Sequence, residues 1–382
     1  MVKIDLFRME RSQALLENVV DYNLSESGVS PLRVGELLGG DFDVNDLLNV
    51  KLGYPWAGGS PGLREAIADF YPGATAANVR VTNGSSEANF MEFWGLLEQG
   101  DRAAVQLPNY MQTWGLARYF SGRVETYRLV ERRRGAGGPR WELDLDSLRR
   151  AVSRRTKVIL ITNPNNPTGS VLTGDEMDAV VEVARQVGAW IVSDEVYRGA
   201  ELEGDITETF FGRYPRVLVT GGLSKAFGLP GLRTGWIVGP PSWVERLERY
   251  HDYLTLTPAM LSERLASLAM QPARRDELLE RTRRIVRSQW PKLQGWVESH
   301  AGLLSAVAPR AGAIAMIRYD LPLSGQALFD RLQREKSVLI NPATHFGIPG
   351  KYFRVGYGYD IDHILKGLDR ISELIEALRA AG

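Results

Sequence analysis

The chain has 382 residues, with 46 basic and 46 acidic side chains and no cysteine. At about 150 residues per domain, this length predicts two or three structural units. A formal net charge of zero excludes a globally basic surface that would attract nucleic acid or an anionic membrane, and the absence of cysteine excludes disulfides, thiolate metal sites and cysteine nucleophiles.

The N-terminal residues do not have the pattern of a secretory signal. Lys3, Asp5, Arg8, Glu10 and Arg11 interrupt the first apolar residues, so no continuous apolar core of a signal peptide is present. No stretch approaches the roughly 18 apolar residues of a membrane span. We therefore expect a cytoplasmic protein with no nucleic-acid or membrane partner, and four histidines leave little for a metal site, so we expect none.

From residue 80 onward, short apolar runs typical of strands alternate with amphipathic segments. We expect strands at 80–82, 103–107, 124–129, 158–161, 189–192, 217–220 and 235–238, and helices at 85–97, 112–120, 145–152 and 175–187. Strands separated by helices of this length indicate βαβ units with right-handed crossovers. The pattern predicts an α/β fold with a mainly parallel seven-stranded sheet and helices on both faces.

The pattern changes after Pro240 and Pro241. Long helices are expected at 242–252 and from 261 to 300, the latter containing Pro272 and Pro291. Short strands at 304–308, 313–318, 338–340 and 353–356 and helices at 325–336 and 361–380 then predict a smaller α+β domain. We divide the chain into an N-terminal segment packing with the small domain (1–50), a large domain (51–240), linking long helices (241–300) and the small domain (301–382).

The segment from Gly221 to Trp236 gives the sharpest chemical signal. Lys225 directly follows an expected strand, and Ser224 and Arg233 accompany it in a glycine-rich stretch. Open α/β sheets bind ligands at the carboxyl ends of their strands. An amine beside an anion clamp suggests a Schiff base to a phosphorylated aldehyde, although a lysine by itself is most often a solvated surface charge.

Three further segments place polar residues after strands. Ser85 and Ser86 begin a helix whose free amides would face an anion, although taken alone a plain N-cap is the better interpretation. Asn166 lies in the rigid turn Asn163–Gly169, which also fits a tight connection. Asp194 follows a buried strand and needs a partner there, for which a protonated ring nitrogen and a structural arginine are equally suitable.

Together these segments resemble the class I/II aminotransferase family of fold-type I pyridoxal phosphate enzymes, the aspartate aminotransferase superfamily. The resemblance covers nearly the whole chain and is carried by Tyr54 with Gly59 and Leu63-Arg64, Asn83–Ala88, Pro108-Asn109-Tyr110, Asn163–Gly169, Asp194–Tyr197, Ser224-Lys225 with Arg233, and Phe353–Gly356. It implies an aminotransferase that uses pyridoxal 5'-phosphate and moves an α-amino group between an amino acid and a 2-oxo acid through a Lys225 Schiff base. It also implies a homodimer with shared active sites.

The resemblance implies three catalytic residues. Lys225 would carry the cofactor and afterwards transfer the proton. Asp194 would keep the pyridine nitrogen protonated, which makes the ring an electron sink. Tyr197 and Asn166 would hydrogen-bond the phenolic oxygen of the cofactor, and Asn166 would also contact substrate.

Further residues would bind the cofactor and substrate. Tyr110 would stack on the cofactor ring, unless it is an ordinary core aromatic. Arg354 would bind the substrate α-carboxylate with a two-pronged contact, unless it pairs with an acid in its own domain. Tyr54 would reach the phosphate of the partner subunit. The remaining phosphate ligands would be Ser85, Ser86, Ser224 and Arg233.

The sequence departs from the family pattern in two places. Gly222 stands where many relatives have a second phosphate-binding hydroxyl, and residues 24–29 differ from the usual segment near the substrate. A second interpretation is a capreomycidine-synthase-like cyclase or lyase acting on a modified amino acid, which Ser27-Gly28-Val29 and Asp252–Leu256 resemble. We rank it second because Tyr54 and Asp194–Tyr197 keep the aminotransferase form. A third interpretation, a DNA-binding regulator of this fold, is remote, since the sequence contains no basic helix that would contact DNA.

Overall fold

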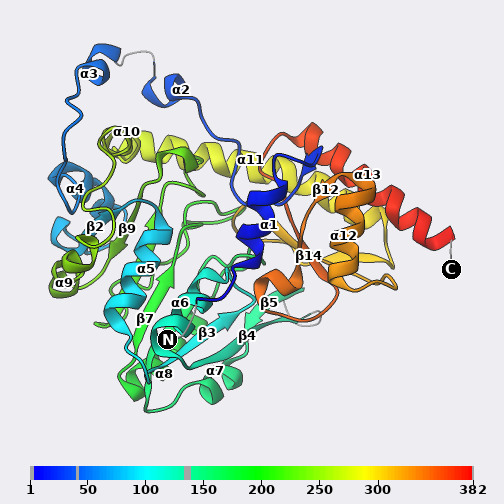
Figure 1. Ribbon diagram of the computed structural model, residues 1–382, viewed down its shortest axis with the longest axis horizontal. Helices are drawn as coiled ribbons and strands as arrows, with labels where there is room; N and C mark the ends of the chain where they lie inside the picture. The colour runs from blue at the N-terminus through cyan, green and yellow to red at the C-terminus, as the bar shows by residue number, and fades with distance from the viewer. Residues whose placement is uncertain (1–3, 40–42, 133–138, 381–382) are drawn as a thin grey trace.

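The computed structural model describes residues 4–39, 43–132 and 139–380. The helices are α1 (Arg8–Leu16), α2 (Val34–Leu38), α3 (Val44–Leu48), α4 (Pro61–Asp69), α5 (Ser85–Leu96), α6 (Gln112–Ser121), α7 (Leu145–Ala151), α8 (Gly174–Val187), α9 (Pro241–His251), α10 (Met260–Ala269), α11 (Pro272–Ser299), α12 (Gly325–Lys336) and α13 (Ile361–Ala380). A large sheet with helices on both faces lies on one side of the molecule, and α12, α13 and β14 lie on the other (Figure 1).

The large sheet has the strand order β2-β9-β8-β7-β6-β3-β4-β5. Its strands are β2 (Val79–Thr82), β3 (Arg102–Leu107), β4 (Val124–Arg132), β5 (Arg140–Leu143), β6 (Thr156–Thr162), β7 (Trp190–Asp194), β8 (Val217–Gly222) and β9 (Gly235–Val238). The five central strands from β8 to β4 are parallel. The predicted α/β fold is confirmed, and all seven expected strands are present. The eighth strand, β5, was missed because only Trp141 of its four residues is buried.

Alternating side chains of the central strands enter different cores. In β6, Ile159 and Ile161 pack into the core on the α8 side, whereas Val158 and Leu160 pack with residues of α5 and α6 on the other side. A strand buried on both faces has this continuous apolar sequence, since successive side chains point to opposite faces. The run at 158–161 was therefore a reliable strand signal.

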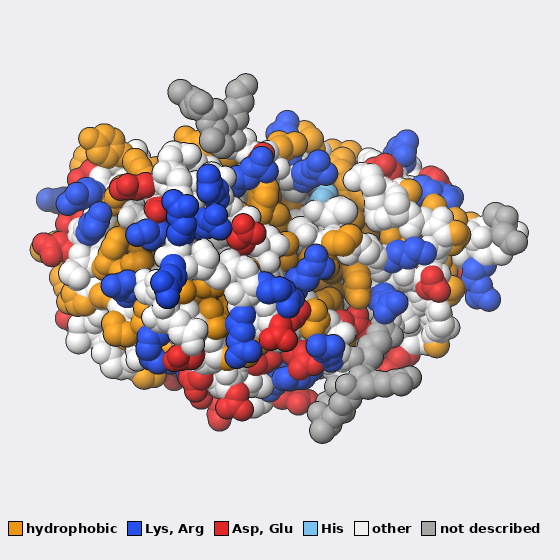
Figure 2. Space-filling model, turned by 90° about the horizontal axis from the view of Figure 1, so that it is seen from below, with side chains coloured by type: hydrophobic (Ala, Val, Ile, Leu, Met, Phe, Trp, Pro, Cys, Tyr) orange, Lys and Arg blue, Asp and Glu red, His pale blue; other side chains and the backbone are white. Residues whose placement is uncertain are grey.

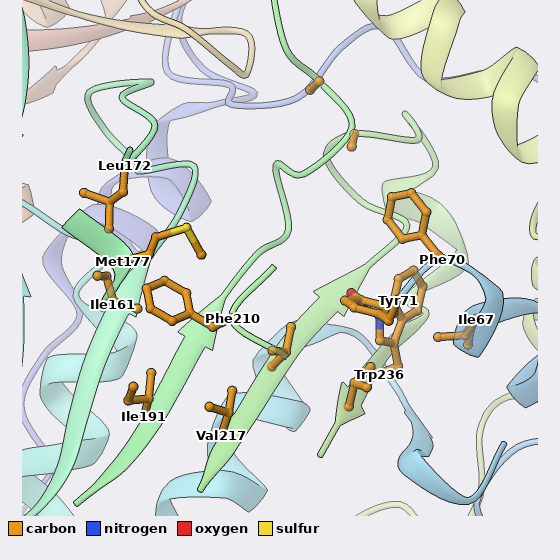
Figure 3. Close-up of a cluster of buried hydrophobic side chains, with 14 of the residues drawn as sticks. Ile67, Phe70, Tyr71, Ile161, Leu172, Met177, Ile191, Phe210, Val217 and Trp236 are labelled. Carbon is orange, nitrogen blue, oxygen red and sulfur yellow. The ribbon is translucent and has the colours of Figure 1, made fainter. Parts of the chain in front are cut away.

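The larger core joins the sheet to α4 and α8. Figure 3 shows Ile161, Ile191 and Val217 on three neighbouring strands of one face, together with the aromatic pair Tyr71 and Trp236. The Trp236 indole N–H donates to the Tyr71 hydroxyl at 2.9 Å. The two polar atoms of this aromatic pair therefore satisfy each other inside the core.

A second core lies in the C-terminal part. Its four-stranded sheet has the order β10-β11-β14-β13, formed by β10 (Leu304–Ala306), β11 (Ile314–Tyr319), β13 (Asn341–Pro342) and β14 (Tyr352–Gly356). Helix α11 contributes Leu278 and Leu279 to the first core and Val286 and Leu293 to the second, so it connects the two parts. Pro291 lies inside α11 and does not end it.

The N-terminal segment contacts both parts. Strand β1 (Tyr22–Asn23) pairs in parallel with β12 (Val338–Leu339), and Leu24 and Val29 join the C-terminal core. Leu37 of α2, in contrast, packs into the larger core. The boundaries that we drew after residues 50, 240 and 300 stay a prediction.

Two further observations concern the surface and the helices. On the face seen in Figure 2, basic and acidic side chains are distributed together with apolar ones. Among the described residues, no helix has both the length and the apolar composition needed to cross a membrane.

Candidate active site

The parallel strands end at one edge of the large sheet, and a cavity of about 350 Å³ lies there. Strands β3, β6, β7 and β8 deliver their following loops to this edge. Nine of the eleven predicted site residues line the cavity: Ser85, Ser86, Tyr110, Asn166, Asp194, Tyr197, Ser224, Lys225 and Arg233. Tyr54 and Arg354 are not among the lining residues.

Lys225 extends its amine into the cavity, three residues after β8 ends. Its Nζ donates to the Ser27 hydroxyl at 2.8 Å, and burial lowers the pKa of the amine, although Glu26 and Glu10 raise it. A lysine with a lowered pKa is a better nucleophile and base at neutral pH. The sequence analysis did not identify Ser27 as a site residue, and the only signal was the unusual segment 24–29.

Asp194 is the last residue of β7 and is almost fully buried. One carboxylate oxygen accepts from the Val196 amide at 3.2 Å. Burial raises its pKa to about 6, against the opposing effects of hydrogen bonds from Val196 and Asn89 and of the Lys225 charge. No arginine pairs with Asp194 within the described chain, so this carboxylate has room for a cationic partner in the cavity.

Tyr197 presents a buried hydroxyl at the cavity. This hydroxyl makes no hydrogen bond of normal geometry to any described residue, although Ser27 lies near enough to lower its pKa. Burial dominates and raises the pKa of Tyr197 to about 12. An orphaned hydroxyl at this depth costs roughly 1–3 kcal/mol unless a ligand satisfies it, so its position favours a bound polar group.

Arg354 lies behind the cavity on β14 and is fully buried. Its guanidinium donates to the Asn166 side-chain oxygen at 2.9 Å and to the Ser25 carbonyl. No carboxylate pairs with it in the described structure, and its Nε has no partner. A buried cation without a counterion is costly, which favours an anionic ligand next to Asn166.

The start of α5 forms a cradle next to Arg233. The N-cap of α5 is Gly84, so Ser85 and Ser86 are the first two helical residues and neither is the capping residue. Gly235 packs against this turn so closely that an added Cβ would lie 2.4 Å from the Ser85 amide nitrogen. Gly222 also faces this turn but leaves more space, because a Cβ there would lie 3.3 Å from the Thr234 carbonyl oxygen and 3.7 Å from Cβ of Ser85.

Arg233 completes the cradle. Its guanidinium donates to the Ser224 hydroxyl at 3.4 Å and packs over Gly84, where an added Cβ would lie 2.5 Å from Nη2. Three serine hydroxyls, the helix amides and a guanidinium thus line one part of the cavity, and this is a suitable set of donors for a phosphate.

One face of α1 covers the cavity with acidic and polar side chains. Glu10, Gln13 and Glu17 line it, and Glu26 joins them from the following loop. The Tyr110 hydroxyl donates to Glu10 at 2.9 Å, so the ring of Tyr110 is held at the cavity wall. The sequence analysis missed these carboxylates, because nothing local distinguishes them from solvated charges on a surface helix.

Tyr54 stands apart from the other predicted residues. It is 84% exposed and lines a separate hollow of about 630 Å³ together with Trp56 and Met260. Within one chain, therefore, Tyr54 does not meet the cradle at α5.

Comparison with known proteins identifies the family. Residues 49–371 match the family model described as aminotransferase class I and II. The chain is 30% identical to capreomycidine synthase of Streptomyces vinaceus over 82% of this chain and 79% of that protein. A crystal structure of a PLP-dependent aminotransferase from Streptococcus suis is similar with a TM-score of 0.90 at 28% identity, covering 99% of each chain. A PLP-dependent cyclase, OrfR, gives a TM-score of 0.86 at 28% identity, covering 100% of this chain and 99% of that one.

The fold and the cavity define a pyridoxal-phosphate-dependent enzyme of fold type I. The chain belongs to the class I and II aminotransferase family, as the resemblance predicted. The cavity fits the cofactor, since it contains an amine, a buried carboxylate, an unsatisfied phenolic hydroxyl and a set of phosphate donors.

Proposed function

We propose that this aminotransferase uses Lys225 to carry pyridoxal phosphate and to move the proton during transfer of an α-amino group from an amino acid to a 2-oxo acid. The single observation that supports this most is the convergence of Lys225, Asp194 and Tyr197 on one cavity. When bound, the cofactor supplies an electron sink for the substrate Cα.

Each cavity residue has a proposed task. Burial lowers the pKa of the Lys225 amine, so it gives up a proton more readily than an exposed lysine does. Asp194 would hold a proton on the ring nitrogen by its charge, and Tyr197 and Asn166 would donate to the phenolic oxygen. The ring of Tyr110 would pack against the cofactor ring. Ser85, Ser86, Ser224 and Arg233 would hold the phosphate.

Arg354 and Asn166 are proposed to bind the substrate α-carboxylate. The guanidinium has no counterion within the described chain and already orients Asn166 at 2.9 Å. A carboxylate placed against both side chains would neutralise the buried cation and accept from the Asn166 amide. This contact would fix the orientation of the substrate Cα relative to Lys225.

A half-reaction tests the proposed activity. An amino-acid donor added to cofactor-loaded protein should convert the absorption of the Lys225-linked cofactor to that of the amine form, with one equivalent of 2-oxo acid released. Lys225→Ala should show no Lys225-linked band at all, whereas Lys157→Ala, at the one exposed position of β6, should behave as wild type. Failure of every donor in a broad panel to convert the band would contradict the proposal.

The acidic face of α1 favours a second candidate function. Glu10, Glu17 and Glu26 line the cavity without an ion pair to any described residue. Their field reaches the reacting amine, because Glu26 and Glu10 oppose the lowering of the Lys225 pKa by burial. Carboxylates that line a cavity without an ion-pair partner among the described residues favour a substrate with a cationic side chain.

Two of the similar proteins are named a capreomycidine synthase and a PLP-dependent cyclase. A cyclase or lyase acting on a modified amino acid with a basic side chain is therefore the second candidate. It is also supported by Ser27, which binds Lys225 and belongs to the segment that resembles capreomycidine synthase.

Product analysis separates the two functions. Transamination yields the 2-oxo acid of the donor and leaves the cofactor as the amine, whereas cyclisation or elimination returns the cofactor unchanged. With a cationic donor, Glu17→Gln and Glu26→Gln should each raise KM, and KM for a neutral donor should stay the same. Equal effects on both donors would remove the support that the acidic face gives to the second candidate.

We also propose a homodimer in which Tyr54 contacts the phosphate of the partner subunit. Tyr54 and Trp56 are 84% and 66% exposed and line one apolar hollow with Met260, and a second copy would cover them. Sedimentation of wild type should give twice the mass of one chain. The Trp56→Asp variant should sediment with a lower mass. A wild-type monomer that binds the cofactor would contradict the proposal.

The cytoplasmic location stays a prediction, which fractionation of tagged protein would test.

A further inference from the structure

A buried carboxyl group lies one layer behind the candidate active site. Glu92, on α5, is fully buried and does not line the cavity. Burial raises its pKa to about 8, with a smaller opposing effect of its hydrogen bond to Thr220, and the nearby charge of Asp194 raises it further. The proposed reaction does not use this residue, and its position in a helix gives no structural reason for an acid.

Hydrogen bonds connect Glu92 to Asn89, next to Asp194. The Thr220 hydroxyl oxygen lies 2.8 Å from Oε2 of Glu92 and 2.9 Å from Oδ1 of Asn89. The Asn89 side chain also lies near enough to Asp194 to lower the pKa of that carboxyl as a hydrogen-bond donor. Thr220 also lies directly beside Asp194 in the register of β7 and β8. Hydrogen bonds therefore join Glu92, Thr220 and Asn89, and this network lies directly beside Asp194.

The number of available protons determines which atom donates in each of these hydrogen bonds. The Thr220 hydroxyl has one proton but faces two oxygen atoms, so one of its neighbours must be a donor. Asn89 cannot be that donor, because its amide nitrogen faces Oε1 of Gln112 at 3.2 Å, and the Gln112 amide donates to the Ser86 carbonyl at 3.1 Å. Glu92 must then carry the proton and donate to Thr220.

We propose that Glu92 is a positioning residue that is protonated at neutral pH and, through Thr220 and Asn89, holds a hydrogen-bond donor near Asp194. This rests on the proposed function of Asp194 as the partner of the cofactor ring nitrogen. Thr220 donates to Asn89, and the Asn89 amide then points at the Asp194 carboxylate. A donor held there stabilises the ionised form of Asp194, since hydrogen bonds to a carboxylate favour its charge.

Two substitutions at one position test this role. Glu92→Gln can still donate to Thr220 but cannot ionise, whereas Glu92→Leu has similar size and no donor. We expect Glu92→Gln to bind pyridoxal phosphate within about twofold of wild type, and Glu92→Leu to bind it roughly tenfold more weakly, as expected for the loss of one buried hydrogen bond. From about pH 7 to pH 9, the cofactor affinity of wild type should fall relative to that of Glu92→Gln, since a carboxyl group with a pKa of about 8 can ionise in this range and a carboxamide cannot.

Thr220→Val provides an independent test if Glu92→Leu does not fold. It keeps the shape of the side chain and removes the hydroxyl, so it should weaken cofactor binding as much as Glu92→Leu does, whereas Thr220→Ser should not. The inference is overturned if Glu92→Gln loses affinity as Glu92→Leu does, or if Thr220→Val binds as wild type. A wild-type protein that shows no Lys225-linked band would instead contradict the proposed function itself.

Discussion

The Arg354 guanidinium donates to the Asn166 side chain at 2.9 Å, although 188 residues separate the two in the chain. Arg354 belongs to the small C-terminal sheet and Asn166 to the loop after β6 of the large sheet. The contact therefore joins the two parts of the molecule at the candidate active site. Because the buried guanidinium has no counterion within the described chain, a substrate carboxylate would strengthen this junction.

Substitution of Arg354 should affect substrate binding and leave cofactor binding unchanged. Arg354→Lys keeps the charge but loses the planar, two-pronged contact. We expect KM for the amino donor to rise roughly 30-fold, which corresponds to about 2 kcal/mol for charge-assisted hydrogen bonds. The measurements are steady-state kinetics and a cofactor titration. Arg318→Lys, on an exposed position of the neighbouring strand β11, is the matched control, and an equal loss of cofactor affinity in Arg354→Lys would contradict the assignment.

The close packing of Gly235 on the start of α5 should make this position intolerant of a side chain. An alanine Cβ would lie 2.4 Å from the Ser85 amide nitrogen and 2.5 Å from the Gly84 carbonyl carbon, so the cradle would have to move. We expect Gly235→Ala to lose at least tenfold in pyridoxal phosphate affinity. Gly231→Ala is the control, because its Cβ would meet nothing within 4 Å. Equal affinities of the two variants would show that the cradle is not part of the cofactor site.

The raised pKa of Asp194 predicts a pH dependence of stability in the cofactor-free protein. Between the ordinary pKa of 3.8 and the folded value of about 6, the folded state holds a proton that the unfolded state releases. The free energy of unfolding should therefore fall as pH rises through this window, by on the order of 3 kcal/mol from this residue. Urea unfolding of wild type and Asp194→Asn should show that the difference in stability between them changes only between about pH 4 and pH 6. A constant difference would contradict the burial argument.

The part of the site that could be predicted consists of residues that follow recognisable strands. Lys225, Asp194 and Asn166 were located because strands with continuous apolar sequence end just before them and parallel strands share one edge. Ser27 and Glu17 could not be located in this way. They come from the N-terminal segment, which reaches the cavity through the pairing of β1 with β12, and such a contact between distant residues leaves no local periodicity.

The fold, like the site, could be predicted only where the local sequence has an apolar pattern. The seven expected strands have side chains buried on one or both faces, which gives them an apolar pattern, whereas β5 is a short edge strand with one buried residue. The N-terminal segment was expected to pack with the small domain, and Leu24 does so, while Leu37 packs into the larger core. Which core an apolar residue joins depends on tertiary packing, and the residue type does not determine it.

Gly222 offers a gain-of-affinity prediction. An added Cβ there would lie 3.7 Å from Cβ of Ser85 and 3.3 Å from the Thr234 carbonyl oxygen, so a side chain would point toward the cradle but would need a small shift of its neighbours. Gly222→Ala and Gly222→Ser share this strain, and their difference isolates the hydroxyl. We expect Gly222→Ser to bind pyridoxal phosphate roughly fivefold more tightly than Gly222→Ala, as one additional hydrogen bond to the phosphate contributes about 1 kcal/mol. The measurement is a cofactor titration of both variants, and Ser85→Ala in the Gly222→Ser background serves as the control for the shared cradle. If serine and alanine bind the cofactor equally, the hydroxyl does not reach the phosphate, and the glycine at this position then reflects the space next to Thr234.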